Sequence, residues 1–579
     1  MDGLDPNIME TMMGKGQLPN FERLAQKGFY SRLKTTNPPQ SPVAWTTIAT
    51  GCEPAEHGIF DFLTRDPETY LLQLTILQRK GSRYIPPFRV KTFWETASEK
   101  GIKSTILRWP LTFPPRKFNG KILAGLGVPD IKGNLGQYTF YTSNPGFDPK
   151  EKKGRIVEVK PQSNKITTKL SGPSFASLTG NRDSSVPLMI EILDDSVRCH
   201  LNDIKFELRS NNWSDWIQAI FNIGLMVKIK GLCKFYLKSI TPEFELYVTP
   251  VQIAPGTFNL PISSPQEYSL DLSEQIGHYA TLGMPEDTNA LNDEMIDEDA
   301  FMMSCNSIMQ ERQKMFFYEL ERFKEGILAC VFDTTDRVQH MFWRYLDNTH
   351  PMYDESAAEI YGDVIPQYYR LMDNILSKVQ DGMSSDTLLM ICSDHGFSSF
   401  KKSVHLNTWL LQNGFMELKD GKKSCEGLFD GVDWTKTKAY AMGFNSIFLN
   451  LQSREREGIV TSEQISNLTE ELAKKLTALT DHGMNVIEKI SGAEKATESG
   501  SSTNMPDLIA GYANNYRCSW QTAIGGIADN NIIEENMKKW SGDHCCDATI
   551  VPGIFFSSEK LSTNNISVLD INKLVGSRI

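Results

Sequence analysis

Two unbroken apolar runs, residues 327–332 (ILACVF) and 388–392 (LLMIC), constrain the fold of this chain more than any other feature. Short runs without polar residues are typical of strands that are buried on both faces in a parallel sheet. Each run is followed at once by ionisable residues, in segments 333–340 and 393–396. In open α/β sheets, ligands bind beyond the carboxyl ends of the strands, so a site is expected at these two segments.

The remaining pattern predicts an α/β fold with a central, mostly parallel sheet flanked by helices. A helix is expected over 18–27, ended by Gly28, because its apolar residues repeat with helical spacing. Helical spacing returns over 265–323 and 462–479. Further strands are expected at 30–34, 104–109, 121–126, 446–451 and 485–489.

Residues 146–262 differ from this pattern, because short β-like runs follow one another with polar turns between them. We therefore predict an inserted, mainly antiparallel β-rich subdomain over 146–262 that covers the active site. Residues 1–145 and 263–579 would form one discontinuous catalytic core. At roughly 150 residues per domain the length would suggest several domains, but candidate ligands near both ends must share one core to form one site.

Composition excludes several classes of protein. The 579 residues carry a formal net charge of -11, which argues against a surface for duplex nucleic acid. Ten scattered cysteines without a CxxC pair predict free thiols in a reducing compartment. No apolar run approaches the ~20 residues of a membrane span, and no signal peptide is visible. These features predict a cytoplasmic protein; they leave its oligomeric state open.

Three clusters could carry chemistry. Asp336 and His340 are four residues apart, which places them on one face of a helix, as two ligands of one metal would be. Asp394 and His395 could both face a metal if Gly396 allows the backbone to bend. His544 follows Ser-Gly-Asp further along the chain. Taken singly, each could instead be a helix cap, a turn residue or a structural histidine.

Ser41, followed by Pro42, marks the expected start of another helix. The simplest interpretation is that Ser41 is the N-cap and Pro42 the first helical residue. The alternative is that Ser41 is a nucleophile, because a helix N-terminus also favours a phosphoryl anion. A divalent cation could activate its weakly nucleophilic hydroxyl.

In order and spacing these segments resemble the type I phosphodiesterase and nucleotide pyrophosphatase family of the alkaline phosphatase superfamily. The resemblance covers both ends of the chain. Its motifs are DGLDP, LPNFERLAQKG, SPVAWTTIATG, EPAEHGIFDF, FDTTDRVQHMFWRYLD, SDHGF, and GDH before PGIFFSS. By position, it implies that Asp2, Ser41, Asp394 and His395 hold one metal ion and that Asp336, His340 and His544 hold the other.

The resemblance implies a hydrolase with two divalent metal ions. Three carboxylates and three imidazoles suit Zn²⁺, with Mn²⁺ or Fe as alternatives. The three negative charges of the carboxylates would leave the two divalent cations with one excess positive charge, which would attract a phosphoryl anion. Ser41 would attack a phosphodiester or nucleotide pyrophosphate and form a phosphoryl-serine that water then hydrolyses. A phosphomonoesterase or phosphotransferase of the same superfamily is the first alternative for this small-molecule phosphoester enzyme.

The chain departs from the family after its HGI motif. Close nucleotide pyrophosphatases continue with Asn-Asn, whose second amide contacts a phosphate oxygen, whereas this chain continues with Phe60, Asp61 and Phe62. A nucleotide substrate is therefore less strongly indicated than a phosphoester in general. Phe62 and Trp45 are candidate substrate-binding residues, although these rings, like Phe342 and Trp343, could simply pack in the core.

Two further comparisons with the superfamily limit the interpretation. Sulfatases need Cys-x-Pro-x-Arg, and Glu56 stands where that arginine would be, so a sulfatase is excluded. Family members place an apolar strand ahead of the first aspartate, whereas Asp2 directly follows Met1. We therefore expect either a truncated N-terminus or a poorly anchored Asp2. The second case would allow a catalytically impaired relative that only binds its ligand.

Overall fold

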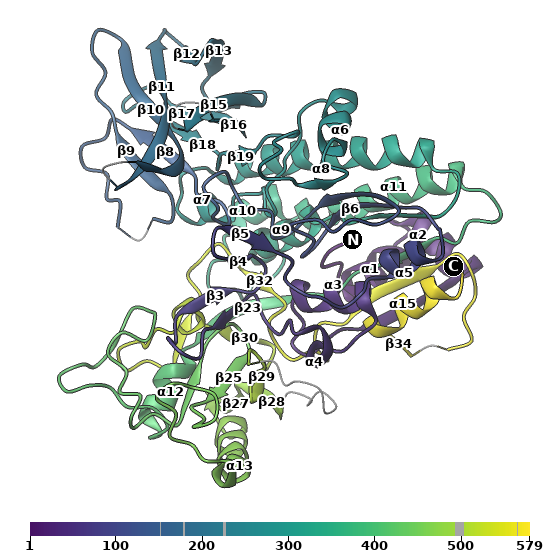
Figure 1. Ribbon diagram of the computed structural model, residues 1–579, viewed down its shortest axis with the longest axis vertical. Helices are drawn as coiled ribbons and strands as arrows, with labels where there is room; N and C mark the ends of the chain where they lie inside the picture. Colours follow the sequence, from purple (N-terminus) through teal and green to yellow (C-terminus); the bar gives the residue numbers. More distant parts are fainter. Residues whose placement is uncertain (151, 178–179, 224–226, 493–502, 564) are drawn as a thin grey trace. The chain divides into compact units, whose positions relative to one another are not determined.

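A computed structural model describes residues 1–150, 152–177, 180–223, 227–492, 503–563 and 565–579 (Figure 1). The chain forms two compact units, with residues 1–83, 87–101 and 335–579 in the first and residues 84–86 and 102–334 in the second. Both units contain helices and strands, which confirms the α/β class. Among the described residues, no helix is both long and apolar enough to cross a membrane.

The first unit contains both ends of the chain. Its main helices are α1 (Pro6–Gly14), α2 (Pro19–Lys27), α3 (Ser41–Thr50), α4 (Pro54–His57), α5 (Phe93–Glu99), α10 (Glu355–Tyr361), α11 (Val364–Gly382), α12 (Leu406–Gln412), α13 (Ile465–Thr477), α14 (Trp520–Ala523) and α15 (Val568–Gly576). Helix α15 lies beside α3 (Figure 1), where Asn572 donates to the Ala49 carbonyl at 2.8 Å. The predicted helix ended by Gly28 is confirmed as α2.

One sheet of this unit has the order β22 (Met390–Cys392), β33 (Gly553–Ser557), β1 (Phe29–Lys34) and β34 (Ile566–Ser567). Strand β33 is antiparallel to β22 and β1, whereas β1 and β34 are parallel. The other strands that position the site are β23 (Ser398–Val404), β25 (Ser446–Leu449), β28 (Ile487–Gly492), β29 (Leu508–Tyr512), β30 (Asn515–Cys518) and β32 (Gly542–Asp543).

The second unit has a sheet with the order β20 (Ser263–Ser264), β7 (Gly120–Ala124), β6 (Ser104–Trp109) and β21 (Ile327–Cys330). Strand β6 runs parallel to both β7 and β21. The predicted return to helical spacing is confirmed by α6 (Tyr268–Ile276), α7 (Thr288–Asn292) and α8 (Glu298–Arg322). Helix α9 (Thr334–Phe342) then carries the chain back into the first unit. That these strands belong to one central, mostly parallel sheet stays a prediction.

The two apolar runs that marked the fold are strands over part of their length, in β21 and β22. The prediction that they are buried on both faces is wrong for β21, because all four of its residues are only half-buried. Both strands lie at an end of the described strand order of their sheets. An edge strand lacks one neighbour, so its side chains keep part of their surface exposed.

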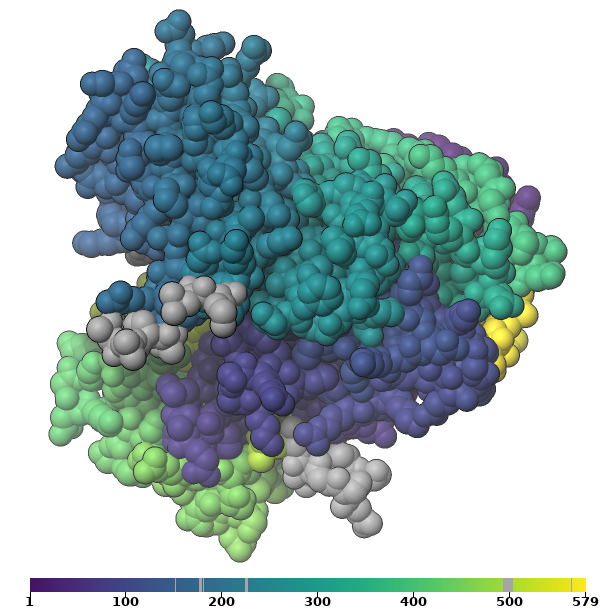
Figure 2. Space-filling model, turned by 45° about the horizontal axis from the view of Figure 1, so that its top comes forward, coloured from purple at the N-terminus to yellow at the C-terminus, as the bar shows by residue number. Residues whose placement is uncertain are grey.

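Residues 146–262 form strands without a helix among the residues that are described there. The strands are β9 (Arg155–Glu158), β10 (Lys165–Ser177), β11 (Gly180–Ile192), β12 (Ser196–Leu201), β13 (Ile204–Arg209), β14 (Asn212–Trp213), β15 (Ile217–Ile223), β16 (Val227–Cys233), β17 (Phe235–Ser239), β18 (Glu245–Val248) and β19 (Gln252–Ile253). Their buried apolar side chains form one core, and in Figure 2 the blue residues form a continuous part of the surface.

The boundaries of this segment as a domain stay a prediction. Strand β8 (Thr139–Thr142) precedes residue 146, yet it pairs with β9 and β18. The β-like runs of the sequence predict strands at 155–159, 165–170, 188–193, 206–208, 226–229, 234–237 and 244–248. These predictions miss β12, β14, β15 and β19, and Met226 lies outside the described residues.

Asp5 connects α1 to the turn that follows β22. Its Oδ1 accepts from the backbone N–H groups of Asn7 and Ile8 at 2.9 and 3.1 Å, and its Oδ2 accepts from Phe397 N at 3.2 Å. We predict that Asp5→Ala lowers the free energy of unfolding by about 1–3 kcal/mol, because a cap is lost and a buried N–H is left unpaired. Asp354→Ala, which removes the exposed cap of α10, should cost about 1 kcal/mol or less. Equal losses in denaturant titrations would contradict this.

Candidate metal centre

The seven predicted metal-site residues all lie in the first unit, and none is more than 3% exposed: Asp2, Ser41, Asp336, His340, Asp394, His395 and His544. They come from five separate parts of the chain. Asp2 precedes α1, Ser41 begins α3, and α9 carries two of the residues. The Asp-His pair follows β22, and His544 follows β32. The structure therefore brings together residues that are up to several hundred positions apart.

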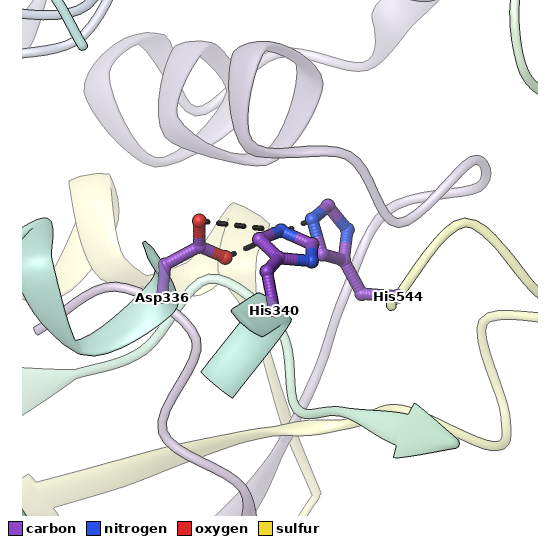
Figure 3. Close-up of side chains that lie close together, drawn as sticks. All are labelled: Asp336, His340 and His544. Atoms are coloured by element: carbon purple, nitrogen blue, oxygen red, sulfur yellow. Dashed lines mark ion pairs between the residues drawn. The ribbon is translucent and has the colours of Figure 1, made fainter. Parts of the chain in front are cut away.

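Asp336, His340 and His544 form the first group of candidate ligands (Figure 3). Their ligand atoms all lie within 4.8 Å of one another. His340 Nε2 is 3.3 Å from Asp336 Oδ2, as the four-residue spacing on α9 predicts, and His544 Nε2 is 3.8 Å from Asp336 Oδ1. One carboxylate thus faces two imidazoles, which is a donor set that Zn²⁺ accepts.

Asp2, Asp336 and His395 form a second group within the same 4.8 Å limit. His395 Nε2 lies 3.8 Å from Asp2 Oδ1 and 3.2 Å from Asp394 Oδ2. Asp336 belongs to both groups, so the two sets of ligand atoms share one region. The geometry therefore offers donors for more than one cation.

The three imidazoles are held in the tautomer that a metal requires. In His340, His544 and His395, Nδ1 lies 2.7, 2.7 and 3.0 Å from the carbonyl oxygens of Gly542, Pro39 and Gly396. A carbonyl only accepts, so Nδ1 must carry the proton in each ring. The Nε2 lone pair is then available, and these are the atoms that face the carboxylates.

Burial keeps two of the rings neutral. It lowers the pKa of His395, and burial together with the neighbouring His395 lowers the pKa of His544 well below its ordinary value. Because a neutral imidazole is the form that binds metal, this adds to the suitability of the site.

The buried carboxylates of this centre are not fully compensated by hydrogen bonds or positive charge. Among the described residues, Asp336 Oδ1 and Asp394 Oδ2 are buried and have no hydrogen-bond partner. Burial and the nearby Asp336 raise the pKa of Asp394 to about 7, and burial, Asp394 and Asp336 raise that of Asp2 well above its usual range. Burial alone would also raise the pKa of Asp336, but His340 and Arg337 hold it below its ordinary value. Divalent cations would satisfy both unpaired oxygens, so the residues present fit a metal centre.

Ser41 differs from its simplest predicted role. The N-cap of α3 is Gln40, and Ser41 is the first helical residue, so the prediction of Ser41 as the cap is wrong. Its Oγ lies 3.0 Å from His395 Nε2 and 3.4 Å from Asp2 Oδ1. The hydroxyl is therefore directed at the candidate ligands.

Asp2 is well anchored, in contrast to the expectation of a loosely held residue. Trp45 Nε1 donates to Asp2 Oδ2 at 3.0 Å, and Thr335 Oγ1 donates to the Asp2 carbonyl at 2.6 Å. The sequence pattern indicates Thr335 only as a possible cap of the helix that carries Asp336, and not as a support of Asp2. The backbone bends at Asp394, as expected, but Gly396 does not have a positive φ. A side chain there would meet the Pro552 carbonyl at 2.6 Å.

The candidate substrate-binding residues lie in different surroundings. Trp45 is buried and its indole N–H is used by Asp2, so its ring is a support of the centre. Phe62 is half-buried and packs edge-on against Phe444, with ring centroids 6.3 Å apart. Asp61 lies in the interior, where its Oδ2 accepts from Gln40 Nε2 at 2.9 Å and from Phe444 N at 2.8 Å.

We predict that metal-stripped Asp394→Asn melts several degrees above the metal-stripped wild type at pH 8, with no difference near pH 4. The folded pKa of Asp394 is raised from 3.8 to about 7, so its contribution to stability is present below about pH 4 and is lost as the pH rises through 7. The amide could instead donate to His395 Nε2. Roughly 1 kcal/mol moves the midpoint by about 2–4 °C in a cooperative unit of roughly 150–250 residues, and by less in a larger one. Thermal unfolding in chelator measures this; a difference independent of pH would contradict it.

Comparison with known proteins shows the family to which the chain belongs. The model of the family described as type I phosphodiesterase / nucleotide pyrophosphatase matches residues 1–171 and 257–519, well over half of the chain. A search of curated proteins found no match.

Solved structures with a similar course of chain include phosphonoacetate hydrolase from Sinorhizobium meliloti 1021 in complex with phosphonoformate. It shares 11% identity at a TM-score of 0.43, over 100% of this chain and 94% of that one. An inactive variant of murine ectonucleotide pyrophosphatase / phosphodiesterase 5, in complex with AMP, shares 9% at a TM-score of 0.39, over 100% and 92%. On the family match, the chain belongs to the type I phosphodiesterase / nucleotide pyrophosphatase family of the alkaline phosphatase superfamily and is a phosphoester hydrolase.

Proposed function

We propose that this hydrolase cleaves phosphodiester or pyrophosphate bonds of small molecules by using Ser41 as its nucleophile and two divalent cations, with Zn²⁺ as the best fit. The observation that carries the proposal is the position of Ser41 Oγ, 3.0 Å from His395 Nε2 and 3.4 Å from Asp2 Oδ1. Ser41 is the first residue of helix α3, and its hydroxyl does not cap that helix. A phosphoryl anion placed there would meet the positive end of the α3 dipole.

The proposed ligands divide as the family resemblance implies. Asp336, His340 and His544 would hold one cation, and Asp2, Asp394, His395 and Ser41 the other. In support, two of the three carboxylates have a buried oxygen without a partner among the described residues, and all three imidazoles offer Nε2. When bound, two such ions would lower the pKa of the serine hydroxyl and stabilise charge on the phosphoryl group and the leaving oxygen.

The residues of the chain then account for the bond changes. Ser41 gives its proton to solvent, and its oxygen bonds to phosphorus in line with the leaving oxygen, whose bond to phosphorus breaks as it departs with the other half of the substrate. The oxygen of a water molecule next bonds to phosphorus, the bond between phosphorus and Ser41 Oγ breaks, and a proton of that water restores the serine hydroxyl. Asp2 orients the nucleophile, while Trp45 and Thr335 fix Asp2.

Substrate preference within the family is proposed from Asp61. It stands where close nucleotide pyrophosphatases have the amide that contacts phosphate, and its carboxylate is occupied by interior donors. Recognition of the phosphoryl group would therefore rest on the cations and the helix terminus. This favours phosphoesters in general over nucleotides in particular, and a phosphomonoesterase remains the alternative.

We also propose that residues 146–262 are an insertion into the catalytic core. The family model leaves residues 172–256 unmatched between its two matched segments, and every described element there is a strand.

Ser41→Ala is expected to reduce hydrolysis of an activated aryl phosphodiester by about 10³-fold or more, because removing a nucleophile removes the covalent route. The fold should be kept, since Gln40, and not Ser41, is the N-cap. Circular dichroism and melting temperature serve as the control. Acid quenching of the wild type during turnover should yield a peptide phosphorylated on Ser41. Turnover of the variant near the wild-type rate would assign the attack to another group.

Metal analysis separates the enzyme from a relative that only binds. Wild type should hold two divalent ions per chain, lose turnover in chelator and recover it with Zn²⁺. His340→Ala should lower the content to about one ion, because it removes a ligand of a single proposed ion. Fewer than two ions in the wild type, together with no hydrolysis of diester or monoester substrates, would overturn the proposed function. Turnover of monoesters alone would favour the phosphomonoesterase.

A further inference from the structure

A fourth buried carboxylate, Asp543, lies next to the metal centre without facing it. It directly precedes His544 in β32 and is 3% exposed. Its Oδ1 accepts from the backbone N–H groups of His544 and Cys545, both at 2.8 Å. One oxygen therefore fixes the backbone from which the His544 side chain departs.

The second oxygen, Asp543 Oδ2, contacts groups on the other side. It accepts from Trp540 Nε1 at 2.7 Å and forms an ion pair with Arg517 Nε at 2.8 Å. The Trp540 ring lies on the His340 imidazole, with centroids 3.7 Å apart and planes 28° apart. Asp543 is thus connected to both imidazoles that face Asp336.

Arg517 is itself held in place. Its guanidinium lies 4.0 Å from the ring centroid of Trp520 and 4.3 Å from that of Phe444, and the residue is 2% exposed. A buried arginine is stable only with a carboxylate partner, and a buried carboxylate only with donors. The pair therefore restrains Asp543 more strongly than an exposed ion pair would.

The backbone between Trp540 and His544 completes the arrangement. The Gly542 carbonyl lies 2.7 Å from His340 Nδ1 and sets the tautomer of that ring. Ser541 N donates to the His340 carbonyl at 2.7 Å. Both carboxylate oxygens of Asp543 are occupied by donors, so Asp543 is not available as a ligand, and its chemistry is that of a support.

We propose that Asp543 is a positioning residue for the metal centre, which fixes His544 through two backbone amides and His340 through Trp540. The inference rests on the proposed function in one respect, namely that the two histidines bind a cation. Carboxylates that orient metal-binding histidines typically contribute 10- to 100-fold to metal affinity. No motif indicated this role, because the Asp of Gly-Asp-His is not itself directed at the centre.

The test is Zn²⁺ affinity of the purified full-length protein, measured by competition with a chromophoric chelator in the absence of substrate. Asp543→Asn should lower the Zn²⁺ affinity of one of the two sites, the one that contains His340 and His544, by about 10- to 100-fold. The asparagine side chain has only one acceptor oxygen. Its NH₂ group would therefore face either the two backbone N–H groups or the donors of Trp540 and Arg517. The visible spectrum of the Co²⁺-loaded variant should differ from that of the wild type, which a merely structural role would not produce.

Asp373→Asn is the matched control. Asp373 is also 3% exposed, and it accepts from the backbone of Asn20 and Phe21 and from the Asn20 side chain at 2.6–3.0 Å. It contacts none of the proposed ligands in the hydrogen bonds described for it. Its variant should lose stability and keep Zn²⁺ affinity. If both variants lose affinity equally, the effect is one of general stability and the proposal is overturned.

A second variant decides the matter if Asp543→Asn fails to fold. Trp540→Phe keeps a ring over His340 and removes the N–H donor, so affinity should fall roughly two- to tenfold, the value of one net hydrogen bond. Unchanged affinity in a folded variant would overturn the positioning role. If the wild type takes up no Zn²⁺, the metal centre itself is wrong, which is a different failure from equal binding by wild type and variant.

Discussion

Mutual repulsion among three buried carboxylates is the constraint on which the rest of this site depends. Asp2, Asp336 and Asp394 are at most 2% exposed. Beyond the effect of burial, Asp336 raises the pKa of both other carboxyl groups, and Asp394 raises that of Asp2. Burial of uncompensated charge costs several kcal/mol per ion. The chain supplies part of the compensation through Arg337, which pairs with Asp336, and the rest must come from protons or cations. Cations suit these carboxylates better than protons do, because protonation would take up the carboxylate oxygens that the three imidazoles face.

The support around these charges is made mostly of backbone. Carbonyl groups of Pro39, Gly396 and Gly542 set the three tautomers, so loop conformation, and not side-chain choice, determines which nitrogen faces the centre. This explains why ligands can come from five chain segments without a dedicated helix bundle. It also explains the close contacts at Gly396 and Gly542, where an added Cβ would meet backbone or side-chain atoms at 2.6–2.7 Å. Rigid loops of this kind hold ligands in place before a cation arrives.

Sequence patterns predicted the centre better than they predicted its supports. The i, i+4 spacing of Asp336 and His340 and the polar segment after β22 pointed to residues that the fold brings together as candidate ligands, because helix periodicity and strand ends are local properties. Because Ser-Pro usually begins a helix, a cap is the simplest local interpretation of Ser41, but its hydroxyl instead contacts Asp2 and His395, which no local pattern shows. The anchoring of Asp2 by Trp45 and Thr335 depends on residues 43 and 333 positions away, and no local pattern records such contacts. The half-buried state of β21 likewise depends on its place at the edge of a sheet.

The same distinction bears on what the site can recognise. By the family resemblance, Asp61 is expected at the position of an amide donor, yet Gln40, Phe444 and Asn445 all donate to its Oδ2. Burial raises the pKa of Asp61 to about 6, and these donors, which favour the ionised form, hold it in the interior. A carboxylate could not replace an amide as a donor to phosphate, and here it connects the residue before Ser41 to the loop that follows β24 (Ala439–Ala441). Asp61 therefore restrains Gln40, the neighbour of the proposed nucleophile Ser41, and its carboxylate is already engaged by donors of the interior.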